Sequence, residues 1–348
     1  MRDVMRVGVI GLGMGRSHVK AFNAHEQTEV VAICDQDEDR LAEVGEANDV
    51  AGRYTDAAAM IAAEKLDIVS IATPNKFHHP YTLMAFEAGA HVFCEKPMAM
   101  NADEAREMIA AGRAAGKRLM INFSYRFSPQ SWALKKEVDR GTLGDIYFAR
   151  TQWLRRRGMP GFGGWFGTKA LAGGGPLIDL GVHRLDLALW LMGYPQPVWV
   201  MGRTYDHIAS ALAKEQGKTF DVEDMAVALI TFDNGATLEV EASWAGNIAE
   251  SELMQTRLLG TKAGLLQHNV NGTYEFEAKL YEERDGAQYD MELRPPVPGV
   301  ESAQAHFVNA LVADTPHIAT GEEGLIVMEL LDAIYESARL GEPVKITP

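Results

Sequence analysis

The sequence has few cysteines, no basic excess and no long apolar run, and each shortage excludes a class of protein. Its two cysteines among 348 residues, Cys34 and Cys94, cannot build a disulfide framework and lack the spacing of a metal site. The net charge of −15 argues against nucleic acid and anionic membranes as partners, because both attract basic surfaces. No stretch approaches the ~20 apolar residues of a membrane span. The apolar run at residues 7–12 is short and breaks into glycines, so we expect no secretion signal and a cytoplasmic location.

The composition, 47% hydrophobic and 23% charged, is that of a globular protein, and the length suits two domains of ~150 residues each. In the first third, short apolar runs alternate with amphipathic stretches. This alternation predicts an α/β domain with a parallel sheet covered on both faces. We expect strands at residues 4–10, 30–34, 67–72, 91–94 and 118–123, and helices at residues 16–25, 37–48, 77–88 and 102–115.

The second half has a different pattern, typical of an α+β domain. Two β-rich runs, at residues 222–232 and 236–244, flank Asp233-Asn234-Gly235, a strong hairpin signal. Further strands are expected at residues 252–259, 264–270 and 274–281, and helices at residues 301–312 and 324–340. We therefore expect one domain at residues 1–121 and a second at residues 122–348.

A glycine-rich turn, Gly11-Leu12-Gly13-Met14-Gly15, follows the first expected strand. Glycines at such a turn let backbone N–H groups approach a pyrophosphate at the N-terminus of the next helix. The turn is one residue shorter than the G-x-G-x-x-G pattern, because Arg16 stands where the third glycine is expected. We therefore expect Gly15 to take the third glycine's place.

Asp35 ends the second expected strand, about 20 residues beyond the glycine turn, where a carboxylate binds both ribose hydroxyls of NAD. The same carboxylate would repel the 2′-phosphate of NADP, and the neighbouring Gln36 offers no compensating cation. NAD is therefore favoured over NADP as the cofactor.

Polar residues also follow the next two strands. Because ligands of open parallel sheets bind beyond the carboxyl ends of the strands, we expect these residues to line the cofactor crevice. They are Thr73, Pro74, Asn75 and His78 after one strand, and Glu95 and Lys96 after the next. The alternative for Glu95 and Lys96 is a plain ion pair on the surface.

The run at residues 173–186 combines three glycines, a proline suited to a first helical turn, and an acid–base pair. Asp179 and His183 are four residues apart, so a helix places both on one face. A carboxylate beside an imidazole is suited to general base catalysis near neutral pH. The alternative is that both residues lie on a solvated helix face.

Taken together, these motifs resemble the Gfo/Idh/MocA oxidoreductases, which include glucose–fructose oxidoreductase and inositol dehydrogenases. The resemblance covers essentially the whole chain. It rests on residues 11–18, Thr73-Pro74-Asn75 with His78, Glu95-Lys96-Pro97, Arg126-Phe127, Gly141-x-Leu143-Gly144 and residues 173–186. It implies a Rossmann domain followed by a domain on a large, open, mostly antiparallel sheet, and assembly into homodimers or homotetramers. The shortened glycine turn and the arginine-rich residues 154–158 depart from the family pattern.

The resemblance further implies an NAD-dependent dehydrogenase that oxidises a secondary hydroxyl of a sugar, sugar derivative or inositol-like cyclitol. His183 would be the base, Lys96 would hold the reacting oxygen and stabilise developing negative charge, and Asp179 would bind a substrate hydroxyl. Inositols, free pyranoses, glycosides and sugar phosphates all fit these three residues. Two other functions stay open, an NAD-dependent glycosidase that uses transient oxidation and a non-catalytic NAD-sensing regulator.

Three further residues are candidates for substrate contact. Arg126 follows the last strand of the first domain, and its alternative is a structural ion pair. Arg155 belongs to an arginine run that would suit an anionic substrate or, alternatively, a solvated strand edge. Trp165 lies in the glycine-rich stretch 158–167, which would suit a lid over the substrate or ordinary packing.

Overall fold

The computed structural model describes residues 4–294 and 299–346, which form two compact units. The first unit comprises Met1–Phe123 and Glu301–Met328, and the second comprises Ser124–Val300 and Glu329–Pro348. This division differs from the expected domains, because the returning segment Glu301–Met328 packs with the first unit. The buried Phe307 of this segment lies 6.0 Å from Phe93, measured between ring centroids.

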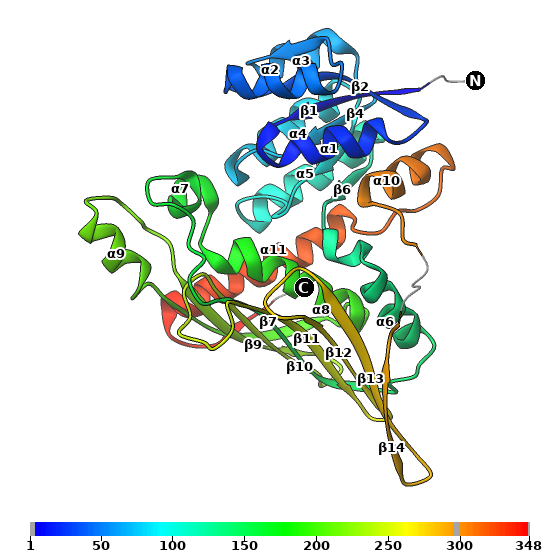
Figure 1. Cartoon of the computed structure of the whole chain (residues 1–348), viewed down its shortest axis with the longest axis vertical. Helices are drawn as coiled ribbons and strands as arrows, with labels where there is room; N and C mark the ends of the chain where they lie inside the picture. The colour runs from blue at the N-terminus through cyan, green and yellow to red at the C-terminus, as the bar shows by residue number, and fades with distance from the viewer. Residues whose placement is uncertain (1–3, 295–298, 347–348) are drawn as a thin grey trace. The chain divides into compact units, whose positions relative to one another are not determined.

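The first unit contains a six-stranded parallel sheet in the order β3-β2-β1-β4-β5-β6 (Figure 1). This is the strand order of a Rossmann fold, and it confirms the predicted fold class. The strands are β1 (Met5–Ile10), β2 (Thr28–Cys34), β3 (Gly52–Tyr54), β4 (Ile68–Ile71), β5 (His91–Cys94) and β6 (Leu119–Ile121). The helices are α1 (Leu12–Asn23), α2 (Glu38–Ala47), α3 (Ala57–Glu64), α4 (His78–Glu87), α5 (Ala102–Ala115) and α10 (Ala303–Val312).

Helix boundaries in this unit follow local capping chemistry. Asn101 accepts a hydrogen bond from the Glu104 amide, so α5 begins where the sequence places it. Helix α1 begins at Leu12, four residues before its expected start, because Gly11 turns the chain directly into the helix. The short β3 and α3 have no counterpart among the predicted elements.

Backbone hydrogen bonds align the carboxyl ends of the strands at one edge of this sheet. The Gly11 amide donates to the carbonyl of Cys34, and the Ala72 amide donates to Ile10. In the same way the Glu95 amide donates to the carbonyl of Ile71. The polar residues that follow these strands are therefore gathered along a single edge, as the sequence predicts.

The second unit contains a nine-stranded sheet in the order β14-β13-β12-β11-β7-β10-β9-β8-β15. Among the described strands of this second sheet, only the pair β10 and β7 is parallel, so the mostly antiparallel sheet is confirmed. The strands are β7 (Ile146–Arg155), β8 (Pro197–Tyr205), β9 (Met225–Phe232), β10 (Thr237–Ser243), β11 (Glu252–Gly260), β12 (Ala263–Asn269), β13 (Phe276–Arg284), β14 (Ala287–Glu292) and β15 (Val344–Lys345). Gly235, with φ at 83°, closes the predicted hairpin between β9 and β10.

Helices cover one face of this sheet. Figure 1 shows α6 and α8 on the same side, where α8 packs on β7 and β11 and α6 packs on β13. The helices are α6 (Pro129–Asp139), α7 (Lys169–Ala172), α8 (Val182–Met192) and α9 (Ala209–Glu215), together with α11 (Gly321–Leu340), which spans the boundary of the two units. The opposite face carries exposed apolar side chains, among them Trp199 and Leu229.

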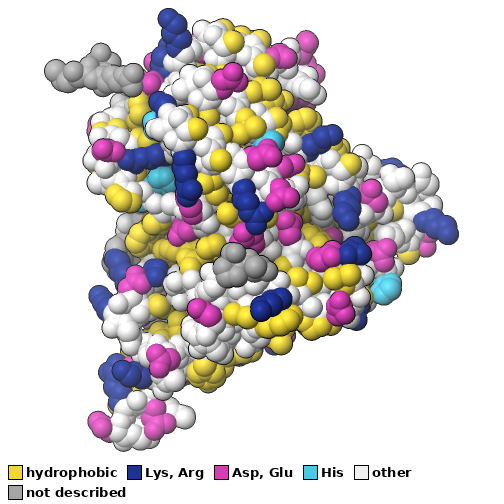
Figure 2. Space-filling view, turned by 180° about the vertical axis from the view of Figure 1, so that it is seen from behind, with side chains coloured by type: hydrophobic (Ala, Val, Ile, Leu, Met, Phe, Trp, Pro, Cys, Tyr) yellow, Lys and Arg dark blue, Asp and Glu magenta, His cyan; other side chains and the backbone are white. Residues whose placement is uncertain are grey.

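The surface is mixed in charge on the face drawn in Figure 2. Acidic and basic side chains are interspersed there, and neither sign gathers into a large continuous area. Among residues 4–294 and 299–346, none of the helices has an apolar stretch long enough to cross a lipid bilayer.

Candidate active site

The glycine turn in the first unit leaves room for a ligand at one glycine and packs tightly at the other two. Gly11 has φ at 86°, and a Cβ there would lie 2.5 Å from the carbonyl oxygen of Ala72. A Cβ on Gly15 would lie 3.0 Å from Val9, so Gly15 fills the close-packing place expected of the third glycine. A Cβ on Gly13 would meet no atom within 4 Å, so the helix N-terminus is open where a pyrophosphate would bind.

Asp35 is held beside this turn by a set of donors. Its carboxylate accepts hydrogen bonds from the Leu12 amide at 2.7 Å and from the Asp37 amide at 2.9 Å. The Arg40 guanidinium lies 3.3 Å away and also pairs with Asp37. The sequence shows Gln36 beside Asp35 but gives no sign of Arg40, which the first turn of α2 brings back to Asp35.

A buried polar network lies beneath the end of β5. His18 has one ring nitrogen 2.8 Å from the Ser70 hydroxyl and the other 2.9 Å from Glu95. Glu95 also accepts hydrogen bonds from the Asn122 side chain and from the Lys96 amide. Burial acts to raise the pKa of Glu95, but these partners, His18 foremost, outweigh it and hold the pKa below its usual value. Glu95 is therefore a buried, ionised anchor for the backbone of Lys96.

His78 joins the two strand ends that carry the predicted cofactor residues. It is fully buried, with Nδ1 2.7 Å from the Pro97 carbonyl and Nε2 2.9 Å from the Thr73 carbonyl. Burial has the largest effect and lowers the pKa of His78, against the two carbonyl groups, which act to raise it. The Thr73 hydroxyl is buried and has no hydrogen-bond partner among the described residues. This hydroxyl and the open space at Gly13 fit a polar dinucleotide along this edge.

In the second unit, Asp179 and His183 stand out by their exposure. Asp179 lies in a π-helical turn, Leu177–Gly181, which runs into α8, rather than in the regular α-helix expected from the spacing. From residue 174 to residue 191, only these two positions keep partial exposure. A solvated helix face is therefore absent here. The helix is buried apart from its acid–base pair, and π-helical turns occur frequently at functional sites.

The start of this helical segment is anchored by Glu223, a residue that no motif in the sequence marks. Its carboxylate accepts hydrogen bonds from the amides of Gly175 and Leu177 and from the hydroxyl of Tyr335. A Cβ on Gly175 would lie 2.0 Å from the Glu223 carbonyl oxygen, so only glycine allows this approach. Burial raises the pKa of Glu223 despite these donors.

Replacing Glu223 with glutamine is expected to lower the free energy of unfolding by about 1–3 kcal/mol, because an NH₂ group then faces buried donors. A raised pKa in the folded state means that the stabilisation by Glu223 is largest below its ordinary pKa and declines as the pH rises. The loss on substitution should therefore be larger at pH 5 than at pH 8 in urea unfolding. The exposed Glu283→Gln is the control, and an equal loss at both pH values would contradict the assignment.

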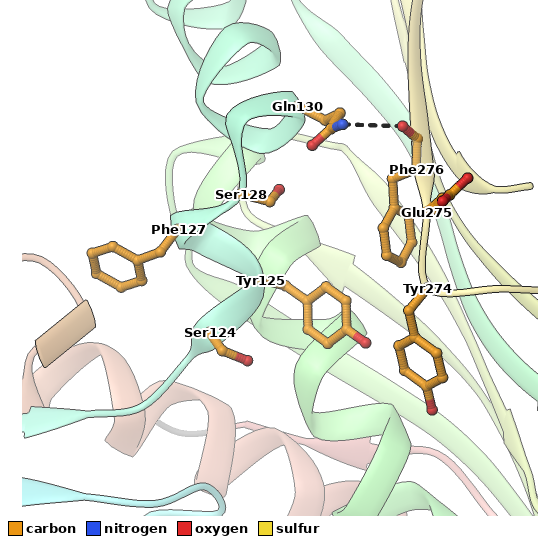
Figure 3. A pocket seen from close by; sticks show the side chains of 8 residues that line it. All are labelled: Ser124, Tyr125, Phe127, Ser128, Gln130, Tyr274, Glu275 and Phe276. Atoms are coloured by element: carbon orange, nitrogen blue, oxygen red, sulfur yellow. Dashed lines mark hydrogen bonds between the residues drawn. The ribbon is translucent and has the colours of Figure 1, made fainter. Parts of the chain in front are cut away.

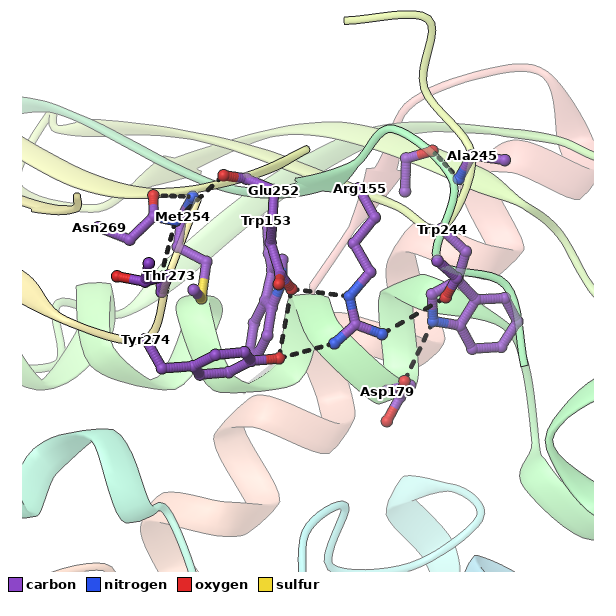
Figure 4. Close-up of polar contacts among 12 residues, drawn as sticks. Trp153, Arg155, Asp179, Trp244, Ala245, Glu252, Met254, Asn269, Thr273 and Tyr274 are labelled. Carbon is purple, nitrogen blue, oxygen red and sulfur yellow. Dashed lines mark hydrogen bonds and ion pairs between the residues drawn. The ribbon is translucent and has the colours of Figure 1, made fainter. Parts of the chain in front are cut away.

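Aromatic rings surround His183. The polar contacts of one of them, Trp153, are drawn in Figure 4. The His183 ring lies 5.1 Å from Tyr125 and 5.6 Å from Trp153, measured between centroids. Glu252 accepts hydrogen bonds from the Trp153 indole at 2.6 Å and from Arg155 at 2.7 Å. These neighbours are distant in sequence, and no local signal joins them to His183.

Trp244 and Tyr274 add further contacts to this region. The Trp244 indole donates to Asp179 at 3.1 Å, which fixes the carboxylate (Figure 4). Arg155 donates a second hydrogen bond, of 2.9 Å, to the Tyr274 hydroxyl. Trp165 stacks on Phe166, with ring centroids 3.8 Å apart, in the loop for which a lid and ordinary packing are the two alternatives.

Arg126 has a different environment from the one expected of a substrate residue. It is fully buried and forms a bidentate ion pair with Asp186, with N–O distances of 2.9 and 2.5 Å. This pairing favours the structural alternative, because a paired and buried guanidinium is not presented to a ligand.

Both units match family models of known oxidoreductases. Residues 5–123 match "Oxidoreductase family, NAD-binding Rossmann fold", and residues 135–346 match "Oxidoreductase family, C-terminal alpha/beta domain". The chain belongs to the Gfo/Idh/MocA oxidoreductase family. The resemblance deduced from the motifs is therefore confirmed, as are the NAD-binding Rossmann fold and the oxidoreductase class.

Several proteins with similar sequences are sugar dehydrogenases by name. D-glucoside 3-dehydrogenase of Escherichia coli (strain K12) is 36% identical over 98% of this chain and 97% of its own length. D-apiose dehydrogenase of Paraburkholderia graminis is 31% identical over 97% of this chain and 88% of its own length.

Solved structures of the Gfo/Idh/MocA fold agree over the whole chain. Levoglucosan dehydrogenase in complex with NADH has a TM-score of 0.87 at 25% identity, with 99% of this chain and all of that chain (100%) covered. The aldose–aldose oxidoreductase of Caulobacter crescentus, complexed with glycerol, has a TM-score of 0.83 at 28% identity, with coverage of 99% and 100%.

Proposed function

We propose that this family member is an NAD-dependent dehydrogenase that oxidises a secondary hydroxyl of a sugar, sugar derivative or cyclitol. The observation that carries the proposal is the exposure of Asp179 and His183 on a helix that is otherwise buried. Polar side chains kept at the surface of an apolar helix need a reason, and acid–base work on a bound hydroxyl supplies one. The names of the similar dehydrogenases support a sugar as the substrate class.

The chemistry assigned to the residues is a proton transfer coupled to hydride loss. When bound, the oxidised nicotinamide supplies the hydride acceptor. His183 takes the hydroxyl proton as the carbon loses its hydride, and Tyr125 and Trp153 limit the access of water to the imidazole. Asp179, fixed by Trp244, binds a substrate hydroxyl. Lys96, whose backbone is tied to Glu95, binds the reacting oxygen and stabilises its developing negative charge.

The cofactor is assigned to the residues at the edge of the parallel sheet. The turn at residues 11–15 would hold the pyrophosphate, and Asp35 would bind the ribose hydroxyls. Thr73, Pro74, Asn75, His78 and Glu95 would line the rest of the crevice.

A panel of sugars, glycosides and cyclitols, followed by NADH absorbance with NAD and NADP side by side, tests the proposal. Steady NADH formation with at least one sugar, and a preference for NAD, are expected. Cleavage of a glycoside with no net NADH would favour the glycosidase instead. Tight NAD binding with no turnover of any compound would favour the regulator.

The helix-free face of the second sheet supports a further part of the proposal, assembly into a homodimer or homotetramer. Trp199 and Leu229, 44% and 45% exposed, lie on neighbouring strands, and a second copy would remove them from water.

Replacing Leu229 with aspartate is therefore expected to shift the protein from oligomer to monomer, because a charge would be buried in the interface. Light scattering after gel filtration measures the mass. Val312→Asp introduces the same charge at an exposed residue of the first unit and should leave the mass unchanged. An unchanged mass for the Leu229 variant would show that this face is not the interface.

A further inference from the structure

A pocket of about 560 Å³ opens in the second unit near the aromatic surroundings of His183 (Figure 3). Its volume is in the range of small-molecule sites. It is lined by Ser124, Tyr125, Phe127, Ser128, Gln130, Tyr274, Glu275 and Phe276. Four of these residues are aromatic and three carry neutral polar groups, so the lining combines apolar surface with hydrogen-bonding groups.

The pocket shares its walls with the proposed reaction centre. Tyr125, in the pocket lining, has its ring 5.1 Å from His183, and Tyr274 lies on the opposite wall (Figure 3). The Tyr274 ring is 6.1 Å from Trp153, which is itself 5.6 Å from His183. The Tyr125 ring therefore belongs both to the pocket lining and to the immediate surroundings of His183.

The charges around the pocket disfavour an anionic occupant. The Arg155 guanidinium is already neutralised by Glu252 at 2.7 Å. Burial lowers the pKa of Arg184 to about 10, so it stays charged at neutral pH, but it is fully buried beneath the Tyr125 ring. Glu275 is the one charged residue in the lining, and its carboxylate is exposed. A phosphate or carboxylate here would meet the like charge of Glu275 and no cation among the lining residues.

We infer that this pocket is a subsite for the non-reacting part of the substrate, and that the preferred substrates are uncharged glycosides rather than free monosaccharides or sugar phosphates. The inference rests on the proposed function, because it takes His183 as the place where the sugar is oxidised. An uncharged sugar or aryl group has apolar faces that match Phe276 and Tyr274. Its polar edge would meet the amide of Gln130, which already donates to the Phe276 carbonyl.

The test compares kcat/KM for phenyl β-glucoside with kcat/KM for glucose. The wild-type ratio should favour the glycoside by about tenfold or more, and Ser124→Trp and Glu275→Trp should each reduce that preference about tenfold by filling the pocket from exposed positions. Ala211→Trp, which adds the same ring to an exposed position of α9, should keep the wild-type ratio. A ratio unaffected by both pocket variants would overturn the subsite while leaving the proposed function standing.

The effect of the Glu275 charge on anionic substrates can be measured separately. With p-carboxyphenyl β-glucoside, Glu275→Gln should raise kcat/KM several-fold relative to phenyl β-glucoside, and no relative change would overturn the exclusion of anions. If the wild type oxidises no sugar, the proposed function fails. Calorimetric titration of the NADH-loaded enzyme with phenyl β-glucoside and glucose then still decides the subsite. Tighter binding of phenyl β-glucoside than of glucose, with this difference lost in Ser124→Trp, supports the subsite. Equal binding of the two compounds to the wild type overturns it.

Discussion

Replacing His183 with alanine should lower kcat by about 10²–10⁴-fold while leaving the Kd for NADH nearly unchanged. The imidazole is the group proposed to accept the hydroxyl proton, whereas the residues assigned to the cofactor belong to the parallel sheet of the other unit. Steady-state turnover with the best sugar of the panel, and NADH binding followed by fluorescence, measure the two quantities separately. An unchanged kcat would remove His183 from the mechanism.

A structural role for His183 predicts a different set of results. Its ring packs against Tyr125 and Trp153, so alanine leaves a gap that alone could disturb the site. His183→Gln keeps most of the volume and a polar end but cannot act as a base near neutral pH, and it should lose as much kcat as alanine. Recovery of turnover in the glutamine variant would indicate packing rather than proton transfer. His207→Ala, at an exposed position, is the matched control.

The elements that could be predicted from the sequence are those whose signals are local. The capped helix α5 and the buried strand β5 carry their full signal within their own residues, and both have the predicted bounds. Strand β3 has three residues, too few to show a period, and it forms because β2 offers an edge to pair with. The return of Glu301–Met328 to the first unit depends on tertiary contacts such as Phe93 with Phe307, which no local pattern records.

The same distinction between local signals and distant contacts applies to the residues of the candidate site. Residues within a motif, such as Asp179 and His183, could be proposed because their spacing carries meaning. The residues that hold this segment in place could not be proposed from the sequence. Trp244 is 65 positions away from Asp179 along the chain, and Glu223 is 48 positions away from Gly175. Arg126 is the opposite case. Its motif suggests a ligand contact, whereas the structure pairs it with Asp186, which lies 60 positions away in the sequence.

Replacing Asp35 with serine should change the preference between NAD and NADP by about 10²–10³-fold in favour of NADP. Loss of one hydrogen bond from a ribose hydroxyl to the carboxylate costs about 1.5–3 kcal/mol, so kcat/KM with NAD should fall about 10–100-fold. The change also removes the negative charge that repels a 2′-phosphate. Arg40, which lies 3.3 Å from Asp35 in the wild type, would then be released to pair with that phosphate.

The contribution of Arg40 to NADP binding can be measured separately from the loss of the negative charge of Asp35. In the double variant Asp35→Ser/Arg40→Ala the loss with NAD should persist, whereas most of the gain with NADP should disappear. Asp37→Ser is the matched control, because Asp37 also pairs with Arg40 and serine remains a good cap for α2, so the cofactor ratio should stay near the wild-type value. If the double variant keeps the full gain with NADP, Arg40 does not bind the phosphate. The exclusion of NADP would then come from the charge of Asp35 alone, and the arginine would serve only to hold that carboxylate in place.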